Sequence, residues 1–249
     1  MTTNTVDVGI GNDLPTVRGV DGSGPSTGAG AFLSGTRPRL GLSLDGRSLT
    51  YNEQAYGSGS LWDMERVEIF RGPQSYIQGR NAIAGAIVMT TKDPIFDWET
   101  AVKGGMGNQH SSQMAAMVNA PLIEDQLAFR ASVDRQRRRS DIDLPAYEPV
   151  GDPREVQTTS ARAKLLFNPA GLRDVTTKLT FNHSDSAAPQ NESLNPIPHP
   201  TNARYESRRP VFKSNVNSGI WDIAWEASEG LKLENRLIYT GFQINRYTA

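Results

Sequence analysis

The sequence DMERVEIFRGPQSYIQGRNAIAGAIVMTTKDP, residues 63–94, packs alternating charges, a sharp turn, a glycine-broken apolar run and a proline stop into one short unit. Gly72 and Pro73 predict the end of a strand, because proline cannot donate to a strand ladder and glycine accepts unusual dihedrals. Gly79 and Gly85 are expected to let the chain turn tightly and neighbouring elements approach closely. The unit therefore predicts a compact, loop-rich α+β structure in the first part of the chain.

The later part of the chain has a different character, because apolar residues alternate with polar ones. In residues 126–134 the odd positions are apolar and the even positions are mostly polar. This period of two places one set of side chains on each face of a sheet, whereas a helix needs apolar residues three and four apart. Strands are predicted at residues 97–106, 112–120, 126–135, 156–167, 174–184, 219–228 and 231–247.

The connections between these predicted strands alternate in length. The short ones are residues 121–125, 168–173 and 229–230. The long ones are residues 136–155 and 185–218, and residues 107–111 make one brief exception on the long-loop side. Short turns at one rim and long loops at the other are typical of outer-membrane β-barrels.

Composition excludes several other classes of protein. The longest apolar run has about eight residues, far fewer than the roughly 18 that a membrane helix needs. The net charge of −1 gives no general attraction to nucleic acid, and the absence of cysteine excludes disulfides and thiolate metal sites. His110, His183 and His199 lack metal-ligand spacing, and residues 19–24 lack the Lys-Ser/Thr ending of a phosphate loop. We predict no catalytic residue, no metal and no cofactor.

Three ordered blocks, residues 16–20, 42–47 and 63–94, carry a family resemblance. They are similar to the plug domain of TonB-dependent outer-membrane receptors. The resemblance implies an α+β plug domain followed by antiparallel transmembrane β-barrel strands, an incomplete barrel. Residues 1–95 are the expected plug, truncated at its N-terminus. Residues 96–249 are the expected first seven or so strands of a C-terminally truncated barrel, because the complete family barrel has twenty-two.

The resemblance also implies roles for individual residues. Arg18 and Arg71 are expected to latch the plug to glutamates on the inner barrel wall, on strands later than those of this chain. The matching plug motif consists of Glu65, Arg66, Glu68, Gly72, Pro73, Gly79, Arg80, Asn81 and Gly85. For Arg66 and Glu68, an exposed salt-bridge lattice within the plug is an equal alternative.

The function that the resemblance implies is active uptake of a bulky, scarce nutrient across the bacterial outer membrane. The expected partners are TonB, with its inner-membrane energising proteins, and a ferric siderophore, with cobalamin, haem, nickel chelates and oligosaccharides as competitors. Residues 21–30, 51–60 and 185–218 are expected to contact the cargo. The alternatives are a soluble or surface β-rich ligand-binding module without transport and a receptor that also signals, which requires an additional N-terminal signalling domain.

Two surface features suggest contacts with the membrane. The basic run Arg135, Arg137, Arg138 and Arg139 lies where the third predicted strand meets a long loop, and it could bind lipopolysaccharide phosphates. A solvated strand end is the alternative. The aromatic residues Trp98, Trp221, Trp225, Tyr239 and Tyr247 suit a lipid-facing band, with ordinary sheet packing as the alternative.

Overall fold

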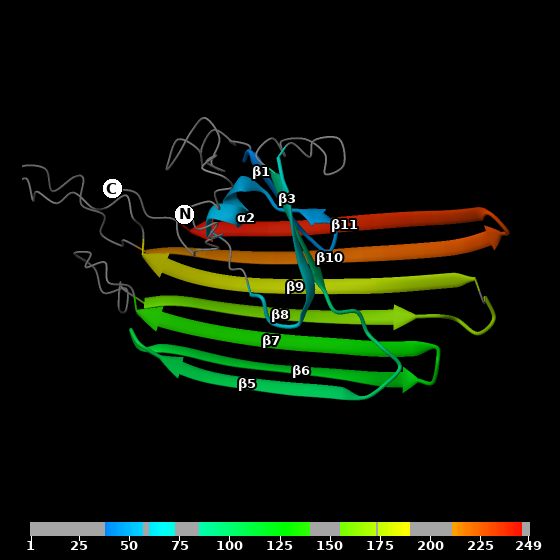
Figure 1. Ribbon diagram of the computed structural model, residues 1–249, viewed down its shortest axis with the longest axis horizontal. Coiled ribbons are helices and arrows are strands. Elements are labelled where there is room, and N and C mark those ends of the chain that lie inside the picture. Colours follow the sequence, from blue (N-terminus) through cyan, green and yellow to red (C-terminus); the bar gives the residue numbers. More distant parts are fainter. Residues whose placement is uncertain are drawn as a thin grey trace, which may run out of the picture.

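The computed structural model describes residues 38–56, 60–72, 85–139, 155–172, 174–189 and 211–245. A small four-stranded sheet lies against one face of a long seven-stranded sheet (Figure 1). Within the described residues no helix is both long and apolar enough to cross a membrane.

The small sheet has the strand order β2-β1-β4-β3. Its elements are β1 Leu40–Leu44, β2 Arg47–Ser48, β3 Met64–Arg71 and β4 Gly85–Thr91, with the helix α2 Tyr51–Tyr56 between β2 and β3. β1 pairs with β4 in parallel, and β3 pairs with β4 antiparallel. Leu40, Leu42, Ile87 and Met89 form its buried core. We call the described residues between 38 and 91 the N-terminal unit.

Two glycines of residues 63–94 have the roles that the sequence predicts. β3 ends at Arg71, and Gly72 follows with a φ of 86°. Gly85 has a φ of 144°, and a Cβ there would lie 2.4 Å from the carbonyl oxygen of Phe70. Only glycine allows β3 and β4 to approach this closely at that position. Pro73, Gly79, Arg80 and Asn81 lie outside the described residues.

The large sheet is antiparallel and runs β11-β10-β9-β8-β7-β6-β5, so each strand pairs with its neighbour in sequence. The strands are β5 Glu99–Gly107, β6 Ser111–Ile123, β7 Leu127–Arg139, β8 Glu155–Phe167, β9 Val175–Pro189, β10 Val211–Ser228 and β11 Leu231–Asn245. All seven predicted strands are confirmed.

The predicted ends of β9 and β10 are wrong. β9 continues to Pro189 and β10 begins at Val211, so residues 190–210 join them rather than 185–218. The two strands keep their ladder through pairs such as Ser186 with Ser214. The extensions, DSAAP at residues 185–189 and VFKSNVNS at residues 211–218, pair through backbone hydrogen bonds and lack the regular apolar alternation that identified the rest. β7 likewise runs to Arg139, so the basic run lies within a strand.

The large sheet turns one face toward the N-terminal unit and the other away from it. Residues 92–98 lead from β4 to β5, and Asn119 of β6 holds this connection in place. The fully buried Asn119 amide donates to the carbonyl oxygens of Ile95 and Asp97 at 2.8 and 2.6 Å, and its oxygen accepts from the Ile95 amide at 3.1 Å. The proposed domain boundary between residues 95 and 96 falls in this connection.

Candidate functional site

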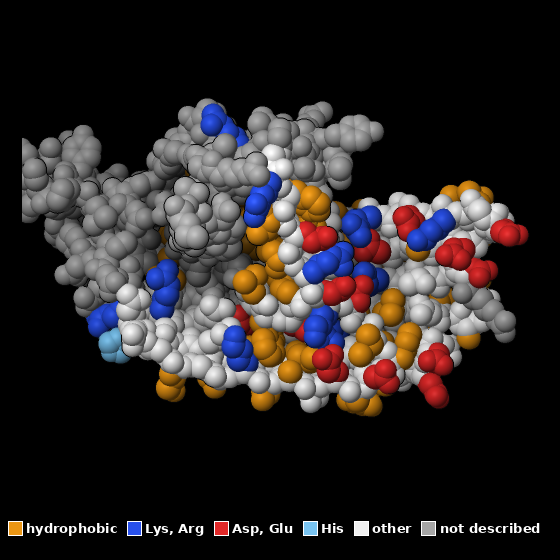
Figure 2. Space-filling model, in the orientation of Figure 1, with side chains coloured by type: hydrophobic (Ala, Val, Ile, Leu, Met, Phe, Trp, Pro, Cys, Tyr) orange, Lys and Arg blue, Asp and Glu red, His pale blue; other side chains and the backbone are white. Residues whose placement is uncertain are grey.

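Four cations stand on the inner face of β7, β8 and β9, the face turned toward the N-terminal unit. They are Arg130, Arg162, Lys164 and Lys178. Each occupies a polar position in a strand that alternates apolar and polar residues, so the alternation itself turns the four charges inward. Figure 2 shows basic and acidic side chains side by side where the N-terminal unit meets the strands. We call the contacts of these four cations the charged seam.

Arg130 makes the strongest contact of the charged seam. Its Nε and Nη2 donate to the two carboxylate oxygens of Asp63, at 2.9 and 2.5 Å. Its Nη1 donates to Glu99 at 2.8 Å. The side chains of Arg130 and Asp63 are only 3% and 6% exposed. A bidentate, buried pair of this kind fixes both orientation and distance, so it ties the N-terminal unit to β7.

Arg162 holds the segment just before Asp63 through its backbone. Its two terminal nitrogens donate to the carbonyl oxygens of Trp62 and Ser60 at 2.6 and 2.8 Å. The Ser60 hydroxyl donates to Asp134 of β7 at 2.6 Å, and the Trp62 indole donates to the carbonyl oxygen of Ala116 at 3.2 Å. Residues 60–63 are thus held by three neighbouring strands.

Lys164 and Lys178 hold the end of β4 and the residues that follow it. Lys164 donates to the Thr91 carbonyl oxygen at 3.0 Å and to Asp93 at 2.7 Å, and Lys178 donates to the other oxygen of Asp93 at 2.8 Å. Burial raises the pKa of the Asp93 carboxyl, but the hydrogen bonds and charges of the two lysines outweigh it. The pKa of Asp93 therefore lies below its ordinary value.

A turn of the N-terminal unit also meets the far strand of the sheet. Gly46, between β1 and β2, has a φ of 79°, and a Cβ there would lie 1.9 Å from a guanidinium nitrogen of Arg236 in β11. Arg236 itself pairs with Asp222 of β10. Any other residue at position 46 would be strained in its backbone and would displace Arg236.

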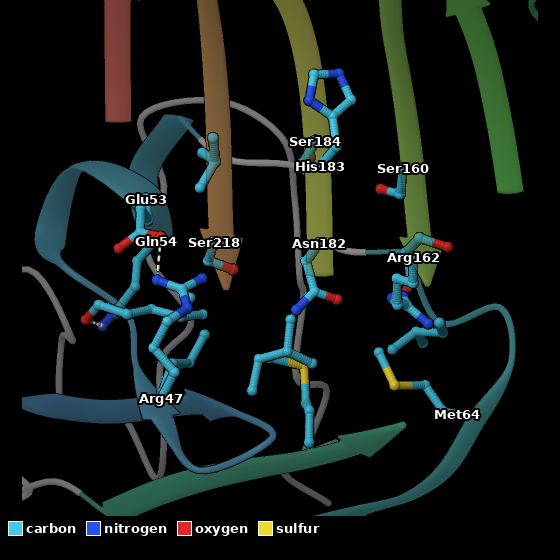
Figure 3. A pocket seen from close by; sticks show the side chains of 17 residues that line it. Arg47, Glu53, Gln54, Met64, Ser160, Arg162, Asn182, His183, Ser184 and Ser218 are labelled. Carbon is cyan, nitrogen blue, oxygen red and sulfur yellow. Dashed lines mark hydrogen bonds and ion pairs between the residues drawn. The ribbon is translucent and has the colours of Figure 1, made fainter. Parts of the chain in front are cut away.

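A cavity lies between α2, β1 and β2 on one side and β8, β9 and β10 on the other, with a volume of about 100 Å³. We call it the α2 cavity. Arg47 and Glu53 form a buried ion pair of 2.6 Å at its edge. Figure 3 shows Asn182 and Ser218 extending from the strands toward Arg47. Both polar atoms of the Asn182 amide, the Ser218 hydroxyl and Arg47 Nε are buried and have no hydrogen-bond partner among the described residues.

Comparison with known proteins identifies this arrangement. Residues 3–86 match the TonB-dependent Receptor Plug Domain. Over this third of its length the chain is similar to the plug of TonB-dependent receptors. The N-terminal unit has the fold of this plug, and β5 to β11 are antiparallel strands arranged like those of the barrel that follows it, here an unclosed sheet.

The similar proteins are siderophore receptors by name. The ferrioxamine receptor of Yersinia enterocolitica is 28% identical over 139 residues, covering 51% of this chain and 19% of that receptor. The ferrioxamine B receptor of Salmonella typhimurium is 31% identical over 85 residues, 33% of this chain and 12% of the receptor. The chain thus spans about a fifth or less of these relatives.

Solved structures share the fold at low sequence identity. The ferric yersiniabactin uptake receptor FyuA from Yersinia pestis has a TM-score of 0.70 at 18% identity, covering 86% of this chain and 33% of that one. The ferripyoverdine receptor of Pseudomonas aeruginosa has a TM-score of 0.63 at 15% identity, covering 80% and 27%. The arrangement of plug and strands is therefore that of siderophore receptor structures.

Of the two residues of the predicted plug latch, the structure describes Arg71. Arg18 is not among the described residues, and Arg71 is exposed at the end of β3 and pairs with none of the described carboxylates. Their partners were expected on later strands, so the latch stays a prediction. Arg66 pairs with Glu65 and Glu68 at 3.0 Å each, on the surface of the plug. These exposed pairs have the geometry of the alternative given above for Arg66 and Glu68, a salt-bridge lattice on the surface of the plug.

The charged seam has the opposite polarity to the predicted latch, and sequence reasoning missed it. Its cations come from the barrel wall, and most of its carboxylates, Asp63 and Asp93 among them, come from the plug and the connection after it, whereas Glu99 lies in β5. A signal was present, because a full charge at an inward position of a barrel strand needs a partner. The partner itself depends on how the plug is seated, which alternation does not reveal.

The remaining predicted residues lie apart from the charged seam. Among the described residues, no group of three or more His, Asp or Glu side chains is placed to hold a metal ion. His110 lies in the turn between β5 and β6, His183 lies in β9, and His199 is outside the described residues. Of the aromatic residues, Trp98, Trp221, Trp225 and Tyr239 are 73%, 45%, 46% and 71% exposed.

Proposed function

We propose that the protein containing this chain takes up a ferric siderophore across the bacterial outer membrane, driven by TonB. The observation that carries the proposal is a folded plug fixed to the inner face of barrel strands by buried ion pairs such as Arg130 with Asp63. A barrel filled in this way is closed to diffusion, so passage of cargo requires work on the plug. The named siderophore receptors among the similar proteins support the choice of cargo.

The same arrangement supports the proposed outer-membrane location. Strands of 13 to 18 residues, such as β6 and β10, exceed the 9 to 11 that cross a bilayer. Their outward side chains include exposed large apolar residues, for example Val133, Leu179 and Trp221. In water such an apolar face would promote aggregation, whereas the acyl chains of a membrane solvate it. TonB and its energising partners are the proposed source of work.

The test uses the complete gene in its own bacterium. Under iron limitation, a deletion strain should lose uptake of one ⁵⁵Fe-labelled siderophore, for example ferrioxamine B, and regain it with the intact gene. Deletion of tonB should abolish the same uptake. Labelled cobalamin serves as the comparison for the competing cargo classes. Unchanged uptake of every labelled siderophore after deletion would overturn the proposal.

A second measurement separates the receptor from the soluble binding module. The full-length protein should fractionate with the outer membrane and migrate faster on detergent gels before boiling than after it, because a barrel resists unfolding by detergent. A protein that stays soluble without detergent, and whose migration does not change on boiling, would support the binding module instead.

A further inference from the structure

The outward face of the barrel strands changes from apolar to polar at one level. Outward positions are those that alternate with the inward cations of the charged seam. Along β7 the outward residue after Val133 is Arg135, and along β9 the one after Phe181 is His183. The first polar outward residues on four neighbouring strands are Arg135, Thr159, His183 and Asn217. These residues mark where the hydrocarbon of a membrane would end.

A closed polar network lies at this level between β9 and β10. His183 joins Asn217 and Asp185 at 2.8 Å each. Asn215 donates to Asp185 at 2.6 Å, and Asn217 donates to Asn215 at 2.7 Å. Four polar side chains in one ring are costly in hydrocarbon but suited to the headgroup layer.

On the side of this network that faces away from the long connections, the outward face contains a groove. Gly219 sits in register beside Phe181, one outward position below the pair of His183 and Asn217. A Cβ at Gly219 would meet no atom within 4 Å. The groove has a volume of about 470 Å³, and its outward side chains are Phe129, Ala163, Leu165, Leu179, Phe181, Trp221, Leu237 and Tyr239. We call it the Gly219 groove.

The basic run divides between the two faces of β7. Arg135, Arg137 and Arg139 take outward positions, and Arg138 takes an inward one. Arg135 is exposed and forms no ion pair with a described carboxylate, and Arg137 has only Glu155 at 3.7 Å. The guanidinium groups of this strip lie two strands from the network of His183, about 10 Å across the sheet. Planar guanidinium groups bind phosphate in bidentate fashion.

We propose that the Gly219 groove and the outward arginines bind one lipopolysaccharide molecule, with an acyl chain in the groove and phosphates on Arg135 and Arg137. The long connections, residues 140–154 and 190–210, leave the strands at this rim, which makes it the outer rim where lipopolysaccharide resides. Gly219 lies beside the network of His183, about 10 Å from the basic strip, so one lipid that reaches both needs a wide headgroup with more than one phosphate, whereas phosphatidylglycerol carries one. The inference rests on the proposed outer-membrane function.

The test measures binding of purified rough lipopolysaccharide to the delipidated full-length receptor in detergent. The double variant Arg135→Gln/Arg137→Gln should lower the affinity roughly tenfold for each charge-assisted bond lost. The matched control is Arg138→Gln, which removes a charge of the same strand on the inner face. For the groove, Gly219→Leu should lower the affinity, whereas Gly104→Leu, with equally open space around its Cβ, should not.

Three outcomes overturn the proposal. One is equal affinity for wild type and the double variant; another is an equal loss in Arg138→Gln. The third is binding of phosphatidylglycerol as tight as that of lipopolysaccharide. Migration before and after boiling confirms that each variant is folded. Siderophore uptake is measured in parallel, so a folded outer-membrane receptor that transports but ignores these substitutions refutes the lipid site alone. A receptor without transport or membrane location refutes the proposed function.

Discussion

The charged seam and the α2 cavity lie on the same face of the same sheet, yet they hold the plug in different ways. In the seam, buried charges meet partners directly, as Arg130 meets Asp63 at 2.5 Å. In the cavity, Asn182 and Ser218 turn buried polar atoms toward the plug, and these atoms meet no partner in the part of the chain that the structure describes. The plug is therefore bound tightly at the charged seam, which includes Lys178 of β9, and loosely at the α2 cavity.

This difference predicts where the plug separates from the wall. Removing one member of a buried ion pair leaves an uncompensated charge, which is strongly unfavourable. Polar atoms that lack a protein partner lose nothing when water reaches them, and they gain hydrogen bonds. We therefore expect separation to begin at the α2 cavity, while residues 60–63 stay anchored by the charged seam.

The largest expected effect is that of Arg130→Met, which leaves Asp63 buried and unpaired. We expect the plug–barrel contact to lose roughly 3–5 kcal/mol, measured as the free energy of unfolding of the plug in the full-length receptor. The matched control is Arg66→Met, because the pairs of Arg66 with Glu65 and Glu68 are on the surface. That variant should unfold like wild type. Equal effects of the two substitutions would mean that the charged seam does not anchor the plug.

The sequence predicts the barrel strands far better than the contacts of the plug. Alternation is a local signal, and residues such as Leu127 and Phe129 repeat it with the period of a strand. It also places Arg130 and Lys164 on the polar face. It cannot name Asp63 and Asp93 as their partners, because those pairs join residues 67 and 71 positions apart. Long-range seating of the plug, rather than strand propensity, decides the site.

A smaller effect is expected for Arg162→Met. The substitution keeps much of the apolar stem but leaves the carbonyl oxygens of Ser60 and Trp62 without their donor. Buried acceptors left unsatisfied cost about 1–3 kcal/mol, so the plug should be destabilised by that amount. Hydrogen exchange of the amides of residues 60–63 should accelerate more than that of β1. Unchanged exchange there would place the anchor of this segment elsewhere.

In the α2 cavity, removing a polar group should leave the stability of the protein unchanged or raise it. Ser218→Val removes a buried hydroxyl that bonds no group within the described ranges, so we expect unchanged stability or a gain of up to about 1 kcal/mol. Ser186→Val is the matched control, because the Ser186 hydroxyl bonds that of Ser214 at 2.5 Å. This control should lose about 1 kcal/mol. A loss in Ser218→Val as large as that in the control would show that the hydroxyl is already satisfied, and the contrast between seam and cavity would weaken.

The smallest effect concerns acid. Lys164 and Lys178 hold the pKa of Asp93 below its ordinary value of 3.8, so the folded protein favours the charged carboxylate more than the unfolded chain does. The resulting stability is fully present above pH 3.8 and is lost as the pH falls through the lowered pKa of the folded state. Asp93→Asn should therefore be less stable than wild type at pH 6, and the difference should shrink in strong acid. Because Asp93 is 45% exposed, the difference at pH 6 should be smaller than that for Arg130→Met. Parallel stability curves for the two proteins down to pH 2 would mean that the lysines do not act through the charge of Asp93.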